Sequence, residues 1–225
     1  MLTELLEVMP GVTAVIGSGG KTTLLRMLAG ELAARGQTVL MCTTTHILPF
    51  DGLVNLADPG ELELEEALRA GGPVCAGTAE SATGKLTALP IPMARLARLA
   101  RYVLVEADGA RGLPLKAHAA HEPVLPAQAG QTICVVGLSG LGRPAAQAAH
   151  RPEIFARLAG VETDAPVTPE AVARVLNAEG LADRCFFNQA DTPERWAQAN
   201  RIAELLECPA AAGSLLKGVC RLCLS

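Results

Sequence analysis

A glycine-rich segment followed by lysine and two threonines carries the most informative chemistry in this sequence. It lies between an apolar run at 12–16 and an Ala/Leu-rich stretch at 21–34. Glycines let the backbone wrap around an anion, so that N–H groups point at it from a helix N-terminus whose dipole favours negative charge. A lysine beside such a loop adds a positive charge for terminal phosphates, and the next hydroxyl can bind Mg²⁺. The residues predicted to surround the phosphates are Gly17, Ser18, Gly19, Gly20, Lys21, Thr22 and Thr23.

The spacing of this segment narrows the type of loop. In the common GxxxxGK[ST] pattern the first glycine would fall on Val15, so the segment is the shorter GxxGKTT form found in Mur ligases. A dinucleotide-binding GxGxxG pattern is excluded, because it would need a glycine where Thr22 stands. The plain alternative is a glycine-rich turn with a lysine there by chance.

Two acidic residues follow a later apolar run, at the point where a nucleotide hydrolase needs them. Glu106 and Asp108 end the sequence Val103-Leu104-Val105-Glu106-Ala107-Asp108. Residues two apart lie on one side of an extended chain, so one can hold Mg²⁺ and the other can orient the attacking water. We expect Asp108 nearest the metal, together with Thr22, and Glu106 as its alternative. Lys21, Glu106 and Asp108 are the predicted catalytic residues, and a solvated Asp-Gly turn is the alternative interpretation.

Hydroxyls also follow the second expected strand, in the sequence Cys42-Thr43-Thr44-Thr45-His46. Polar residues at the carboxyl end of a parallel strand point into the crevice where ligands bind in open α/β sheets. Thr45 could therefore reach the γ-phosphate or the metal. Alternatively, these threonines only finish a strand, and His46 only contacts a neighbour.

The segment Asn188-Gln189-Ala190-Asp191 resembles the guanine-binding NKxD motif with glutamine in place of lysine. In that motif the aspartate accepts both guanine N–H donors, so Asn188 and Asp191 predict base recognition. The competing interpretation makes Asp191 the first residue of a D-x-x-E capping box with Glu194. The predicted cofactor is Mg²⁺ with GTP or ATP, with a preference for GTP.

The elements that must position these residues alternate between short β-branched runs and longer helical patterns, which is typical of β-α units around a parallel sheet. Strands are expected at 12–16, 38–43, 73–76, 102–106, 132–136, 185–187, 209–212 and 219–224, and helices at 21–34, 61–70, 152–159, 169–177 and 193–206. Between them, 49–59 is expected to be a loop and 108–131 a long irregular segment. The fold class is therefore α/β, with three layers and a mainly parallel sheet. The length of 225 residues predicts a single nucleotide-binding domain over 1–225.

Composition excludes several classes of protein. Half of the residues are hydrophobic and the formal net charge is −4, which argues against a nucleic-acid partner. No stretch is long and apolar enough for a membrane span, and the first residues lack a basic, signal-like region. Seven cysteines, mostly in apolar runs, indicate free thiols in a reducing compartment. We therefore expect a cytoplasmic protein with neither a nucleic-acid nor a membrane partner.

Taken together, the motifs resemble the YqeC family, accessory proteins of selenium-dependent molybdenum hydroxylases. The matching stretches are IGSGGKTTLL, CTTTHI, VEADGARGLPLKA, HEPVLP, GLSGLG, HRPE, FFNQAD and GSLLKGVCRLCL. The resemblance implies a P-loop NTPase-like domain and a partner that is a molybdenum hydroxylase or one of its cofactor-assembly proteins. It also draws attention to Arg111, Lys116, Glu122, His150 and Arg151, which could bind a second anionic ligand or a client, or could be solvated loop charges.

Three classes of function remain at this point. The first is an NTP hydrolase that couples turnover to cofactor maturation. The second is a nucleotide-gated binding module with little hydrolysis, whose switch is the segment 108–131. The third is a Mur-like ATP-dependent ligase, which the length disfavours because those enzymes need additional substrate domains.

Overall fold

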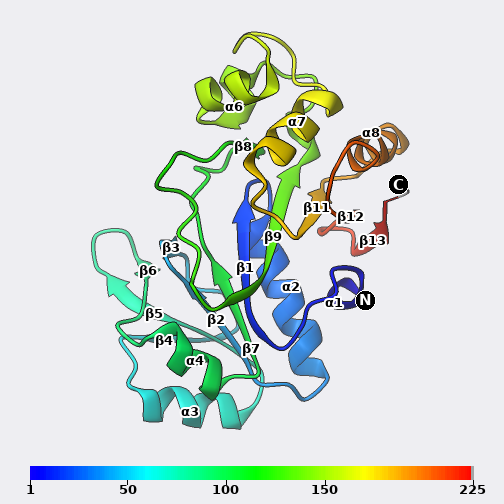
Figure 1. Cartoon of the computed structure of the whole chain (residues 1–225). Coiled ribbons are helices and arrows are strands. Elements are labelled where there is room, and N and C mark those ends of the chain that lie inside the picture. Colours follow the sequence, from blue (N-terminus) through cyan, green and yellow to red (C-terminus); the bar gives the residue numbers. More distant parts are fainter. Residues whose placement is uncertain (224–225) are drawn as a thin grey trace. The chain divides into compact units, whose positions relative to one another are not determined.

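The structure is a computed structural model that describes residues 1–223, so the last residue of the strand expected at 219–224, Leu224, lies outside the described residues. The chain forms two compact units whose segments alternate along the sequence. The first unit comprises Met1–Val15, Thr22–Asp108 and Val124–Gln131. The second comprises Ile16–Lys21, Gly109–Pro123 and the chain from Thr132 onward. Figure 1 labels the elements of both.

The first unit is built on a parallel sheet whose strand ends carry the predicted chemistry. Its parallel strands are, in order, β1 (Gly11–Gly17, in this unit as far as Val15), β7 (Tyr102–Glu106), β2 (Val39–Thr43) and β5 (Pro73–Glu80). Glu106 pairs in register with Val15 on one side and Thr43 on the other. Because parallel strands end at the same edge, the segments that follow β1, β7 and β2 all leave the sheet there.

Shorter strands extend the far side of this sheet. They are β4 (Val54–Ala57), parallel to β5, and the antiparallel β6 (Lys85–Thr87) and β3 (His46–Ile47). The loop predicted at 49–59 is therefore wrong in part, since β4 lies inside it. Most of β4 is exposed, so its sequence carries no continuous apolar run that would mark a strand.

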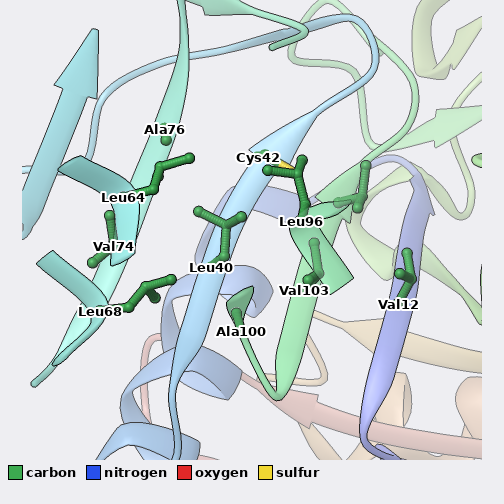
Figure 2. Packing of buried hydrophobic residues seen from close by; sticks show 11 residues of the cluster. Val12, Leu40, Cys42, Leu64, Leu68, Val74, Ala76, Leu96, Ala100 and Val103 are labelled. Atoms are coloured by element: carbon green, nitrogen blue, oxygen red, sulfur yellow. The ribbon is translucent and has the colours of Figure 1, made fainter. Parts of the chain in front are cut away.

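Helices cover both faces of the first unit's sheet. Figure 2 shows one face, where side chains of the strands pack against the helices α3 (Glu61–Ala70) and α4 (Met93–Leu99). Helix α2 (Lys21–Ala34) lies behind the strands in the same view. The buried cluster consists of Val12, Leu40, Cys42, Leu64, Leu68, Val74, Ala76, Leu96, Ala100, Val103 and Val105. The strand residues between them, such as Met41 and Leu104, are also fully buried, because successive side chains point to opposite faces.

The main strands of the second unit are β9 (Ala129–Gly137, in this unit from Thr132), β11 (Arg184–Asn188) and β12 (Ala210–Ser214), which are parallel, and the antiparallel β13 (Val219–Leu222). Its helices are α5 (Ala145–Ala148), α6 (Pro152–Ala159), α7 (Pro169–Glu179) and α8 (Pro193–Ala203), with the 3₁₀ turn η1 (Leu138–Gly140). Two residue pairs form a separate small sheet, β8 (Leu115–Lys116) beside β10 (Ala149–His150).

The α/β class with a mainly parallel sheet is confirmed, whereas the single-domain expectation for 1–225 stays a prediction. The bounds predicted for α3, β7 and α6 agree with the structure, and Thr168 caps α7 as its hydroxyl accepts from the Ala171 N–H. The segment 108–131 is irregular apart from β8 and the start of β9. Among the described residues no helix is long and apolar enough to cross a bilayer.

Candidate functional site

The glycine-rich loop follows β1 and adopts a backbone that only glycine accommodates readily. Gly17, Gly19 and Gly20 have φ values of +89°, +82° and +139°, a region that other residues rarely enter. The space available for a Cβ at these glycines is equally restricted. A Cβ on Gly17 would lie 2.3 Å from the carbonyl oxygen of Val135, and one on Gly20 would lie 2.3 Å from Nδ2 of Asn188. These positions therefore require glycine for both conformation and packing.

Backbone groups of the second unit hold this loop in place. The N–H of Ser18 donates to the carbonyl of Val135 at 2.8 Å, and the Ser18 hydroxyl donates to the carbonyl of Leu113. A Cβ on Gly19 would lie 2.5 Å from the Cα of Gly137, so two glycines let the chains approach closely. Leu113 lies in the segment 108–131, which the sequence predicts to be irregular, and Gly137 is singled out only within the stretch GLSGLG. Nothing local in the sequence marks their contact with the loop.

Lys21 is the first residue of α2, and its side chain lies against the loop. The residue is buried, and its Nζ donates to the carbonyl of Gly17 at 2.8 Å. Thr22, which is exposed, and the half-buried Thr23 follow in the first turn of the same helix. The lysine and the first helical N–H groups therefore occupy the order that anion binding at a helix N-terminus requires.

In the first unit, Glu106 lies against the threonine that follows this lysine. Glu106 is the last residue of β7 and is largely buried, and its Oε2 accepts from the Thr22 hydroxyl at 3.1 Å. Asp108, two residues further on, is only 1% exposed. The described contact joins Thr22 to Glu106, which the sequence treated as the alternative to Asp108, while the role of each acid stays a prediction.

Thr45 reaches the same strand end through another threonine. The Thr43 hydroxyl donates to the backbone carbonyl of Glu106 at 2.7 Å and accepts from the Thr45 N–H at 2.9 Å. The hydroxyl oxygens of Thr43 and Thr45 are 3.4 Å apart. His46, which begins β3, lies 3.4 Å from a carboxylate oxygen of Glu80. The threonine turn thus belongs to the edge that carries Glu106, whereas His46 contacts a neighbouring strand.

Asn188 braces the glycine loop in the second unit. Its Nδ2 donates to the carbonyl of Gly19 at 2.8 Å, and its Oδ1 accepts from the N–H of Leu215 at 3.1 Å. The next residue, Gln189, has a φ of +68°, and its Oε1 accepts from the Ser139 N–H at 3.2 Å. The asparagine therefore connects the predicted base-recognition segment directly to the predicted phosphate loop.

Asp191 is not the cap of the helix that follows it. Thr192 occupies the N-cap position of α8, where its hydroxyl accepts from the Arg195 N–H at 3.3 Å. The capping interpretation of Asp191 is therefore wrong. Its carboxylate is 36% exposed and lies 3.6 Å from the Arg195 guanidinium and 3.9 Å from the Lys217 ammonium. A carboxylate at the surface has lone pairs with which it can accept further hydrogen bonds.

The donor set near Thr22 suits a hard cation. A threonine hydroxyl and the carboxylates of Glu106 and Asp108 are oxygen ligands, which Mg²⁺ prefers. Mg²⁺ commonly uses one or two carboxylates and takes its other ligands from phosphates and water. Residues 1–223 contain no group of three or more His, Cys, Asp or Glu side chains able to hold a metal.

Comparison with known proteins places these residues in a family. Residues 13–153 match the sequence model of the family described as YqeC protein. The protein YqeC of Escherichia coli (strain K12), itself described as uncharacterized, is 36% identical over 180 residues, which cover 76% of this chain and 70% of that protein. The crystal structure of the hydrogenase maturation factor HypB from Archaeoglobus fulgidus covers 96% of this chain and 88% of its own, with a TM-score of 0.43 and 12% identity.

The crowding around the loop predicts a strong effect of a single methyl group. Gly20→Ala combines a positive φ with a Cβ that would clash with Asn188, so we expect the free energy of unfolding to fall by about 1–3 kcal/mol. The matched control is Gly30→Ala in α2, where nothing lies within 4 Å of the new Cβ. It should raise that free energy by about 0.5–1 kcal/mol. Urea unfolding of both variants provides the measurement, and equal stabilities would contradict this account of the loop.

Proposed function

The chain belongs to the YqeC protein family, and we propose that it binds a nucleoside triphosphate with Mg²⁺ and hydrolyses it. One observation carries the proposal. The glycine loop has three positive φ values and leads directly into Lys21, whose buried ammonium lies on the loop at the start of a 14-residue helix. This is the arrangement that cradles phosphates, because N–H groups, the helix dipole and a lysine all favour the same anion.

The roles of the loop residues follow from their chemistry. N–H groups of Gly17–Thr23 would surround the phosphate oxygens, and the Lys21 ammonium would move from the carbonyl of Gly17 to the terminal phosphates. This exchange replaces a hydrogen bond to a neutral carbonyl by one to an anion, which is the stronger of the two.

Thr22, Glu106 and Asp108 would hold the metal. When bound, Mg²⁺ neutralises negative charge on the phosphate oxygens during transfer. The hydrogen bond from Thr22 to Glu106 fixes the direction of the hydroxyl, and the carboxylate would accept hydrogen bonds from metal-bound water. The second carboxylate would orient the attacking water. Thr45, which follows β2, would reach the γ-phosphate or the metal.

Base recognition is assigned to the segment that begins at Asn188. The contact between Asn188 and Gly19 supports this assignment, since it ties the segment to the phosphate loop. Asp191 offers an exposed carboxylate as acceptor for the two N–H donors of guanine, and it does not cap α8, since Thr192 does. We therefore propose a preference for GTP, with binding of ATP as well.

The biological role follows from the motifs that resemble the family. We propose that the protein acts as an accessory factor in the maturation of a selenium-dependent molybdenum hydroxylase, with the hydroxylase or its cofactor-assembly proteins as partner. Phosphate release, measured with and without such a hydroxylase, separates a hydrolase from a nucleotide-gated binding module. Turnover in either condition supports the hydrolase, while binding without turnover supports the module.

Removal of the loop lysine tests the nucleotide site. Lys21→Ala should weaken binding of Mg-GTP and Mg-ATP at least about ten-fold, because a charged hydrogen bond to phosphate is lost. Lys85→Ala in β6 is the matched control and should bind as the wild type does. Isothermal titration calorimetry measures both, and equal affinities for the wild type and Lys21→Ala would refute the phosphate-loop assignment.

The two acidic residues have separable effects on metal dependence. Asp108→Asn should impair Mg²⁺-dependent turnover more than it impairs metal-free nucleotide binding. Glu106→Gln should raise the Mg²⁺ concentration needed for half-maximal activity, because the substitution weakens the contact of residue 106 with Thr22. The exposed Asp51→Asn serves as control. If a folded Asp108→Asn protein turned over normally, the metal role would belong to Glu106 or to the threonines after Cys42.

A single carboxylate should decide the choice of base. Losing a hydrogen-bonded partner costs about 1–3 kcal/mol, so Asp191→Asn should weaken the binding of GTP roughly 5- to 150-fold and shift the preference toward xanthine nucleotides. Glu194→Gln, in the first turn of α8, is the matched control and should leave the preference unchanged. Competition between labelled GTP, ATP and XTP supplies the measurement. A preference for ATP that is unaffected by Asp191→Asn would remove the base site from this segment.

A further inference from the structure

A second group of charged residues gathers in the second unit, away from the glycine loop in sequence. We name it the basic cluster and define it as Lys116, His150 and Arg151 with Glu122, together with Arg111, whose charge acts on His150. The small parallel sheet builds it, because β8 and β10 place Lys116 opposite His150 in register. The N–H of Ala117 donates to the carbonyl of His150 at 3.1 Å and continues this pairing.

The carboxylate of Glu122 interacts with two cations in this cluster. Lys116 has a side chain only 1% exposed, and its Nζ donates to the carbonyl of Gly109 at 2.6 Å and lies 3.6 Å from Oε1 of Glu122. Arg151 donates from Nε to the other oxygen of Glu122 at 2.7 Å. Glu122 is thus shared between an ammonium and a guanidinium, and the remaining guanidinium N–H groups of Arg151 lie in a side chain that is 30% exposed.

The electrostatics of the cluster favour an anion. Burial acts to raise the pKa of Glu122, but the hydrogen bond from Arg151 and the charge of Lys116 outweigh it and lower that pKa to about 2. Burial, then the charges of Lys116 and Arg151, and finally Arg111 lower the pKa of His150, with Glu122 opposing them. His150 therefore experiences more positive than negative charge, and an added anion beside it would relieve this imbalance.

His150 also holds a polar atom that lacks a partner. Within residues 1–223, its Nδ1 is buried and makes no hydrogen bond. A buried polar group without a partner is costly, and a bound water or ligand is what supplies the missing hydrogen bond at such an atom. A neutral imidazole can present Nδ1 as a donor, which is what an anionic oxygen requires.

The backbone supports the same interpretation. Arg111 and Arg151 have φ values of +50° and +65°, which are uncommon for residues other than glycine. Strained conformations of this kind cost about 1–3 kcal/mol and concentrate at ligand sites, where the surrounding structure holds them. Both strained residues of the cluster are arginines, whose planar guanidinium groups match phosphate oxygens in pairs.

We propose that the basic cluster is a second anion site, which binds the phosphate group of a small molecule through Arg111, Arg151 and His150, with Lys116 and Glu122 holding Arg151 in position. The site shares no residue with the triphosphate loop at Gly17–Thr23. Its ligand is either free phosphate or a phosphate monoester, and these share the tetrahedral oxyanion that the donors recognise.

Histidine NMR tests this site directly in the Lys21→Ala protein, where the glycine loop lacks its lysine. The chain has four histidines, so His150→Gln identifies the His150 resonance. Inorganic phosphate, added at constant ionic strength, should shift this resonance saturably and raise the pKa of His150, because a nearby anion favours the imidazolium. A parallel titration with glycerol phosphate distinguishes the two sources. Tighter binding of the ester indicates a phosphorylated small molecule, and tighter binding of phosphate indicates the free ion.

Matched variants make the result specific. Arg111→Gln and Arg151→Gln should each weaken the phosphate effect at least about ten-fold, whereas Arg157→Gln, in the last turn of α6, should not. Arg111 is exposed, so its variant tests the site even if Arg151→Gln destabilises the fold. No saturable shift of His150, or a shift that all three variants retain, would overturn the proposal. This outcome is separate from nucleotide binding at Lys21, which calorimetry measures independently.

Discussion

The close packing of backbone around Gly17–Gly20 is the constraint on which the candidate site depends. Where a Cβ would stand at these glycines, the structure has the carbonyl of Val135, the Cα of Gly137 and the amide of Asn188. Each of these neighbours comes from the carboxyl end of a strand of the second unit, β9 or β11. The loop is therefore shaped by its surroundings as much as by its own sequence, which gives the N–H groups fixed directions before any ligand arrives.

The sequence predicted the parts of this arrangement that are local. The order of apolar run, glycines, Lys21 and helix depends on residues within about twenty positions, and periodicity located α3, β7 and α6 for the same reason. The sequence did not predict the short strands β3 and β6 or the exposed strand β4. Segments of two to four residues are too short to show a clear hydrophobic periodicity. Asn188 was predicted from a motif, but its bond to Gly19, 169 residues away, is a tertiary contact that spacing cannot reveal.

The pair Glu106 and Asp108 shows a similar limit. Residues two apart share a side only while the chain remains extended, and β7 ends at Glu106. The Ala107 N–H still donates to the carbonyl of Val15 at 3.0 Å, but Asp108 lies outside the strand, so spacing alone does not place its side chain. In the structure, the Glu106 carboxylate accepts a hydrogen bond from the Thr22 hydroxyl, and the Glu106 backbone carbonyl accepts one from the Thr43 hydroxyl. One residue thus connects the start of α2 to the threonine turn after β2.

The glycine loop and the basic cluster are joined by a short stretch of chain in the second unit. The carbonyl of Leu113 accepts from the Ser18 hydroxyl, and the carbonyl of Pro114 accepts from the Gly137 N–H at 2.9 Å. Lys116 follows two residues later, in β8. A change in the loop on phosphate binding would reach Lys116 through this stretch, so we expect occupation of one anion site to alter affinity at the other. Linkage makes such an effect reciprocal, so the proposed nucleotide would influence the proposed phosphate ligand as strongly as that ligand influences the nucleotide.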